Sequence, residues 1–257
     1  MAATLQSLLG GEPKVEKVIE GLAGADGPVY SRRGYLLFSD VPARRIMKSE
    51  GGQPTAYRTD SNGAAGLSFD HEGRLLACEA NRITRTEKNE DITVLTSNNN
   101  APADVVYAID GSIYFTDGEA VHQITSKGVT QPVSQECRAP HGVALSPTQQ
   151  KLYVSDASSR NIRVHDVQAN GLLRTGHVFA SVPDTPKGLK TDEDGDLWVA
   201  TAKGVSIFDP AGALLGTITT PEPATSCCWG EGFRDLYLTA GTSVFKISTK
   251  IVGTRTF

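Results

Sequence analysis

Three ionisable residues occupy matching places in a repeated pattern of short segments. Asp26, His141 and Lys187 each precede a glycine at the start of a strand-like segment. A desolvated lysine can act as a nucleophile, a Schiff-base former or a general base, whereas a charged lysine stabilises an oxyanion. Histidine moves protons near neutral pH, and an aspartate beside the lysine would form an ion pair with it. These three side chains are therefore the candidate catalytic residues.

The segments that carry them recur six times. The clearest copy, residues 186–199, reads as a strand, an Asp-x-x-Gly turn and a second strand, and the copies begin at residues 26, 65, 103, 141, 187 and 226. A period near 40 residues built from short strands and Gly/Asp turns is typical of a β-propeller with four strands per blade. The sequence thus predicts an all-β fold, a six-bladed β-propeller of four-stranded antiparallel blades. The three ionisable residues would begin the innermost strands, which line the central channel.

The ends of the chain indicate how the ring closes. The last copy begins at Ser226, and the 31 residues that follow leave room for three strands. We expect residues 15–22 to supply the missing outer strand, because closing the ring avoids an open sheet edge. A blade buries its faces only against its neighbours, so residues 1–257 are predicted to form a single domain.

Composition argues against several classes of partner. The net charge is −4 with no basic run, which argues against nucleic acid and anionic membrane surfaces, and no apolar stretch approaches the ~20 residues of a membrane span.

The four cysteines lack paired Cys-x-x-Cys spacing, so we expect free buried thiols and a reducing compartment. The first 13 residues lack the basic and apolar regions of a signal peptide. The expectation is a cytoplasmic protein with a small-molecule substrate.

The repeat also carries a resemblance to a known family. As a set, its motifs resemble the family of gluconolactonase, senescence marker protein-30 and luciferin-regenerating enzyme. The matching motifs span essentially the whole chain and lie at residues 37–43, 73–79, 110–117, 145–156, 188–195 and 204–210. The resemblance implies a six-bladed propeller that binds a divalent cation, often calcium or zinc, at the channel mouth and opens sugar lactones or related esters.

The sequence departs from that family at the cation site. The resemblance places Glu, Asn, Asn and Asp ligands at the first residues of four copies, where this chain has Asp26, Ala103, His141 and Lys187. A protonated lysine has no lone pair for a metal, and calcium prefers six to eight oxygens. Zinc would accept Asp26 and His141 but needs a third protein ligand. We therefore expect no cofactor and no intact calcium or zinc site, with Asp26 and His141 as the only candidate ligands left.

Four further residues are candidates for substrate binding: Asn100, Glu79, Arg82 and Ala103. Glu79 and Arg82 follow the second strand of the second copy, from which they could reach the mouth, although solvated loop charges are the simpler interpretation. Asn100 lies in a loop, where hydrogen bonding to the backbone explains it equally well. The aspartates that follow inner strands in other copies are expected to cap turns; these are Asp40, Asp117 and Asp156.

Three functions remain open at this point. The first is a lactone or ester hydrolase in which Lys187 replaces the metal. The second is a metal-free lyase, cyclase or isomerase that uses Lys187, Asp26 and His141. The third is a non-catalytic binding propeller in which these residues only plug the channel. An open channel would favour the enzymes and a filled channel the binding protein.

Overall fold

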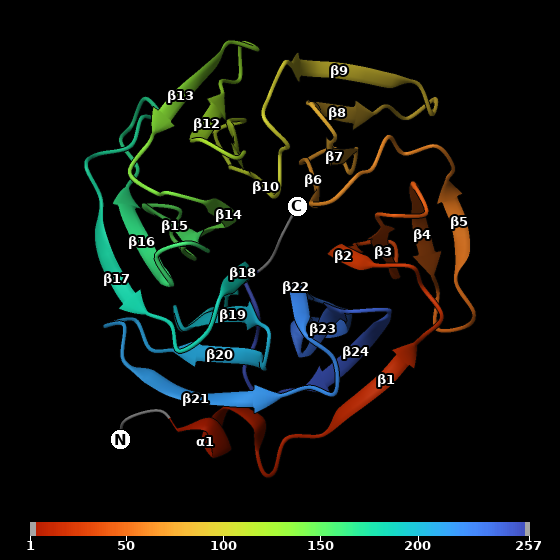
Figure 1. Ribbon diagram of the computed structural model, residues 1–257, viewed down its shortest axis with the longest axis vertical. Helices are drawn as coiled ribbons and strands as arrows, with labels where there is room; N and C mark the ends of the chain where they lie inside the picture. The colour runs from red at the N-terminus through yellow and green to blue at the C-terminus, as the bar shows by residue number, and fades with distance from the viewer. Residues whose placement is uncertain (1–3, 255–257) are drawn as a thin grey trace.

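The computed structural model describes residues 4–254, which form six four-stranded antiparallel sheets arranged as blades around a central axis (Figure 1). The all-β, six-bladed propeller predicted from the repeat is confirmed. The innermost strands are β2 (Ala25–Ser31), β6 (Leu67–Phe69), β10 (Val105–Tyr107), β14 (Pro140–Leu145), β18 (Pro186–Thr191) and β22 (Ala224–Trp229).

The remaining strands follow outward in chain order within each blade. Blade one adds β3 (Tyr35–Asp40), β4 (Arg45–Ser49) and β5 (Thr55–Arg58). Blade two adds β7 (Leu75–Glu79), β8 (Arg82–Thr86) and β9 (Ile92–Ser97). Blade three adds β11 (Ile113–Thr116), β12 (Val121–Ile124) and β13 (Thr130–Ser134). Blade four adds β15 (Lys151–Asp156), β16 (Asn161–Asp166) and β17 (His177–Ser181). Blade five adds β19 (Leu197–Thr201), β20 (Gly204–Phe208) and β21 (Leu214–Thr219).

Blade six is closed by the N-terminal part of the chain, as predicted. It contains β22, a short 3₁₀ turn (Glu231–Phe233), β23 (Asp235–Ala240) and β24 (Ser243–Ser248), and β1 (Val15–Ile19) pairs antiparallel with β24 as its outermost strand. The pairing places Val15 opposite Ile247. It covers the edge that β24 would otherwise expose. The helix α1 (Leu5–Leu9), capped by Thr4, buries Leu8 in the core of blades five and six.

The core consists of apolar layers between neighbouring blades. Leu37 of blade one, for example, packs in one cluster with Leu67 and Phe69 of blade two. Because both faces of a blade are covered, second strands such as β7 and β19 are buried at every residue. The adjacent Cys227 and Cys228 belong to different layers, as expected for successive residues of a strand. All four cysteines are buried and free, which confirms the prediction of free buried thiols.

The structure corrects the boundary of the sixth repeat by one residue. Ala224 pairs with Ala240 at the start of blade six, just as Ala25 pairs with Asp40 at the start of blade one. The residue that follows Ala224 is Thr225, so Thr225 and not Ser226 is equivalent to Asp26. A register shift directly after this point in the strand hides the match from a simple alignment.

The longer spacing after the fourth copy has a structural cause. The segment between β16 and β17 contains an isolated β-bridge between Val167 and Leu173. It also contacts blade three, where the Tyr114 hydroxyl donates to the Gly171 carbonyl over 2.6 Å. In the described residues no helix is long and apolar enough to cross a membrane.

Candidate functional site

The first residues of the six repeats form a ring at one end of the inner strands, called here the mouth. Its members are Asp26, Ala65, Ala103, His141, Lys187 and Thr225, each partly exposed. Four of them lie in the inner strands, and the two alanines lie just before β6 and β10. The sequence prediction that Asp26, His141 and Lys187 begin the innermost strands is therefore correct.

Close contact between neighbouring blades fixes the backbone of this ring. A Cβ atom on Gly27 would lie 2.0 Å from the Ala65 carbonyl oxygen, and one on Gly142 would lie 2.2 Å from that of Lys187. Only glycine allows blades to approach so closely at these points. The glycine that follows a mouth residue thus serves packing between blades.

Side-chain hydroxyls join the blades at the same level. The Ser155 hydroxyl donates to the Lys187 carbonyl over 2.7 Å, and the Thr116 hydroxyl donates to the His141 carbonyl. Thr225 likewise donates to the Ala25 carbonyl over 2.8 Å, which links blade six to blade one. These bonds hold the backbone of the candidate residues in place, so their side chains start from rigid positions.

Asp26 and His141 influence each other across the mouth. Burial raises the pKa of Asp26 above its ordinary value, and the nearby His141 and the Gly27 N–H, 2.8 Å from Oδ1, oppose that rise. Burial lowers the pKa of His141, while the charges of Asp26 and Asp104 oppose the decrease. His141 Nδ1 is buried without a hydrogen-bond partner in the described part of the chain. The imidazole is thus held neutral near pH 7, beside a carboxylate that would stabilise its protonated form.

Lys187 lies within electrostatic reach of both residues, because its charge lowers the pKa of Asp26 and also that of His141. The predicted ion pair between Lys187 and Asp26 does not form: within residues 4–254 the Lys187 amine has no ion pair and no hydrogen bond. The two residues lie on blades one and five. A free ammonium is therefore available to a molecule bound there.

Asp104 is a site residue that the sequence reasoning missed. It occupies the second position of its repeat, where blades one, two, four and five have glycine. Its buried carboxylate accepts the Val105 N–H over 2.9 Å and the Val143 N–H over 3.1 Å. Comparing second positions as well as first positions would have revealed it. Among the described residues, no group of three or more His, Cys, Asp or Glu side chains is placed to hold a metal ion.

The other candidate binding residues lie elsewhere or are occupied. Glu79 is 1% exposed and accepts bonds from Arg58, from Arg82 Nε over 2.7 Å and from the Thr84 hydroxyl over 2.7 Å. Glu79 and Arg82 therefore belong to an ion-pair network at the junction of blades one and two. The exposed Asn100 donates from its side-chain amide to Glu119 over 3.2 Å, and its side chain is a loop contact. Of the four binding candidates, only Ala103 lies in the mouth ring.

The turn-capping role expected for three aspartates is confirmed. Asp40 accepts the Ala23 and Gly24 N–H groups, Asp117 accepts those of Glu119 and Ala120, and Asp156 accepts those of Ser158 and Ser159. None of the three is free for chemistry.

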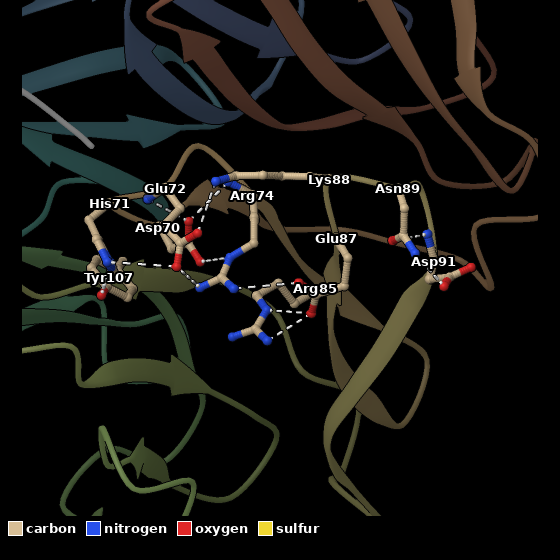
Figure 2. Close-up of polar contacts among 10 residues, drawn as sticks. All are labelled: Asp70, His71, Glu72, Arg74, Arg85, Glu87, Lys88, Asn89, Asp91 and Tyr107. Carbon is tan, nitrogen blue, oxygen red and sulfur yellow. Dashed lines mark hydrogen bonds and ion pairs between the residues drawn. The ribbon is translucent and has the colours of Figure 1, made fainter.

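The opposite end of the inner strands carries a separate polar network. Figure 2 shows Arg74 between Asp70, 2.7 Å from its Nε, and Glu87, with Arg85 also bound to Glu87. His71 contacts the Tyr107 hydroxyl over 2.5 Å beside a cleft of about 510 Å³. These charges neutralise one another and tie the strands of blade two together. They lie outside the mouth.

A small cavity lies among the inner strands on the side away from the mouth. The cavity among the inner strands measures about 50 Å³ and is lined mainly by apolar residues such as Val29, Leu67 and Val105. Thr254 borders it at the end opposite the mouth, where its N–H donates to the Thr191 carbonyl over 3.1 Å. A volume of this size holds about one or two water molecules.

Comparisons with known proteins agree with this architecture. Residues 24–242 match the model of the SMP-30/Gluconolactonase/LRE-like region. The chain is 25% identical to a gluconolactonase of Zymomonas mobilis, over 97% of this chain and 85% of the relative. It is also 25% identical to the lactonase drp35 of Staphylococcus epidermidis, over 82% of this chain and 73% of the relative. Among solved structures, a gluconolactonase from Xanthomonas campestris superposes with a TM-score of 0.90 at 28% identity, covering 97% of this chain and 93% of that one.

Proposed function

Because the chain belongs to the SMP-30/gluconolactonase/LRE-like family, we propose that it hydrolyses a small cyclic ester at its mouth without a divalent cation. Support for a lactone substrate comes from the gluconolactonase and lactonase relatives. The observation that carries the metal-free form is the unpaired Lys187 ammonium, placed within electrostatic reach of the Asp26–His141 pair.

The donor set of the mouth does not suit the cation that the family resemblance implies. Ala103 offers no side-chain donor, and Lys187 adds a positive charge where a metal would require a ligand. Among the described residues, Asp104 does not join Asp26 and His141 in a group placed to hold a metal ion. Asp26 and His141 are then the remaining candidates, fewer than the three protein ligands of a catalytic zinc site. We derive no catalytic step through a metal.

The proposed reaction uses one water molecule per lactone. Neutral His141 accepts a proton from the water while the water oxygen bonds to the ester carbonyl carbon. The carbonyl oxygen becomes an oxyanion, which the Lys187 ammonium stabilises. Asp26 stabilises the imidazolium that forms across the mouth. The ring C–O bond then breaks, and the imidazolium returns its proton to the leaving alkoxide, which yields the open hydroxy acid and the original enzyme.

The test is turnover of a lactone panel by protein freed of metal. Protein dialysed against EDTA and shown by elemental analysis to lack divalent ions should release acid from a lactone, followed with a pH indicator. Added Ca²⁺ or Zn²⁺ should not raise the rate. Turnover that appears only after a metal is added would overturn the metal-free mechanism. Absence of turnover on every lactone would overturn the assignment as a hydrolase.

A second candidate is a non-catalytic binding propeller. The cavity of about 50 Å³ among the inner strands is too small for a sugar lactone, which supports this candidate. This candidate expects a ligand that binds at the mouth and is recovered unchanged. The same panel separates the two, because binding can be measured in samples where no acid is released.

A further inference from the structure

A second lysine of the inner strands, Lys190, lies inside the propeller. It follows the mouth residue Lys187 by three positions on β18. The residues three positions after each mouth residue form a second ring, and all six of them line the small cavity of about 50 Å³ among the inner strands. Lys190 is the only charged member of this second ring. The other five members are Val29, Ser68, Val106, Ala144 and Cys228.

The described part of the chain places no negative charge beside Lys190. No acidic side chain of residues 4–254 lines the cavity. The Lys190 ammonium forms no ion pair within the same range, and its Nζ donates to the Leu189 carbonyl over 3.1 Å. The neighbouring Cys228 thiol provides no countercharge, because burial raises its pKa and keeps it protonated. A partly buried ammonium without a countercharge is costly, so a bound anion would relieve that cost.

Two more hydrogen-bond donors line the same cavity. The Ser68 hydroxyl, on blade two, has no hydrogen-bond partner within residues 4–254. The Gln149 side chain accepts the Ile109 N–H at its oxygen over 2.8 Å, and its NH₂ group has no partner among these residues. An ammonium, a hydroxyl and an amide from three different blades are the kinds of donor that bind an anion.

The size of the cavity selects a small anion. About 50 Å³ holds one or two water molecules, and a chloride ion fits a space of this size whereas a sugar acid does not. We propose that the cavity binds one chloride-sized monovalent anion between Lys190 of blade five and Ser68 of blade two, with Gln149 as a further donor. Blades two and five face each other across the ring, so the anion links them through its centre (Figure 1). This site is separate from the mouth and does not depend on the proposed hydrolysis.

Thermal unfolding in two sodium salts of equal ionic strength tests the site. One salt is the chloride, and the other is the isethionate, whose anion is monovalent but too large for the cavity. With a Kd of about 10 mM, about 100 mM chloride should raise the melting temperature of the wild-type protein by roughly 4 °C over isethionate. Lys190→Met should abolish this difference. Ser68→Ala should raise the chloride concentration that gives half of the effect by about tenfold.

Lys187→Met is the matched control, because it removes the other lysine of the same strand, at the mouth, and should keep the full chloride effect. Broadening of the chloride-35 NMR resonance by the protein measures binding directly, and it should be lost in Lys190→Met and reversed by bromide. Equal melting temperatures of the wild-type protein in both salts would overturn the proposal. A chloride effect that survives in Lys190→Met, or that disappears in Lys187→Met, would do the same.

Circular dichroism establishes that each variant is folded. If Lys190→Met is not folded, the comparison of wild type with Ser68→Ala decides the question. A weaker chloride effect in Ser68→Ala supports the site, and an equal half-maximal concentration in the two proteins overturns it.

Discussion

Asp26 and His141 begin the inner strands of blades one and four, on opposite sides of the six-bladed ring, and yet each shifts the pKa of the other. The charges of the two residues interact across the mouth, although no ion pair joins them within residues 4–254. This electrostatic interaction links parts of the chain that are more than 100 residues apart in sequence. In the proposed mechanism this interaction supports His141 as a neutral base, and it is the basis of the first prediction.

The decrease of kcat/KM at low pH, the acid limb of the pH–rate profile, should reflect protonation of His141. Burial lowers its pKa below the ordinary value of 6.5, and catalysis requires the neutral imidazole, so kcat/KM should fall only when the pH falls below that value. Replacing Asp26 by Asn removes a charge that raises the pKa of His141, so the limb should move to lower pH. A pH series of kcat/KM on one lactone measures both effects. A limb that is unchanged in the Asp26→Asn variant would contradict the coupling.

Lys187 should be required for turnover but not for folding. The change Lys187→Met keeps the length of the side chain and removes the charge, and we expect kcat to fall by about 10²-fold or more, as for loss of an oxyanion-stabilising group. The melting temperature should stay within a few degrees of wild type, because Lys187 forms no ion pair or hydrogen bond among the described residues. Lys203→Met, at an exposed lysine of the same blade, is the control. Unchanged kcat in Lys187→Met would remove the residue from the mechanism.

Restoring two oxygen ligands should create a cation site. The double variant Ala103→Asn, Lys187→Asp removes the positive charge and adds side chains of the types that the family resemblance places there. Calorimetry should then detect Ca²⁺ binding with a Kd below about 1 mM, within the range of protein calcium sites. The wild-type chain and the single variant Ala103→Asn should show no heat of binding. Equal Ca²⁺ affinity in wild type and double variant would refute the argument against a native metal site.

Glu79 should behave as a structural residue. It is buried with Arg58, so Glu79→Ala would leave the guanidinium without its carboxylate and should reduce the free energy of unfolding by about 3–5 kcal/mol. Urea denaturation measures this loss, and Glu119→Ala, at an exposed residue, should change stability by less than about 0.5 kcal/mol. A stable Glu79→Ala protein with a raised KM would instead indicate contact with substrate.

Asp196 should lower the stability of the fold as the pH rises, whereas a carboxylate in an ion pair would raise it. Burial raises its pKa to about 6, with further repulsion from Asp192, so the folded state binds a proton more tightly than the unfolded state does. Its effect is therefore neutral below about pH 4 and destabilising as the pH rises through 6. Asp196→Asn should raise the free energy of unfolding by about 1–2 kcal/mol at pH 7 and hardly at all at pH 4. Equal effects at both pH values would refute the assignment, and Asp60→Asn, at an exposed residue, is the control.

The repeat alone was sufficient to predict the fold. Short apolar strands and Gly/Asp turns at a fixed period describe local structure, and stacking of identical units then leaves one solution, a closed ring of blades. The same reasoning placed residues 15–22 at the edge of the last blade, because three strands cannot close it. Chemistry at the mouth was also partly predictable, since equivalent positions in each repeat must lie at equal height, which identified Asp26, His141 and Lys187.

Only the tertiary structure decided which of these groups interact. Positions along a strand fix height but not the direction of a long side chain. The ion pair expected between Lys187 and Asp26 therefore does not form within residues 4–254, and Asp26 interacts electrostatically with His141. Glu79 looked free in sequence because Arg58, its partner, comes from the neighbouring blade. The register shift that aligns Thr225 with Asp26 likewise depends on pairing between strands. Sequence periodicity thus determined where the backbone lies, whereas contacts between blades determined which side chains remain available.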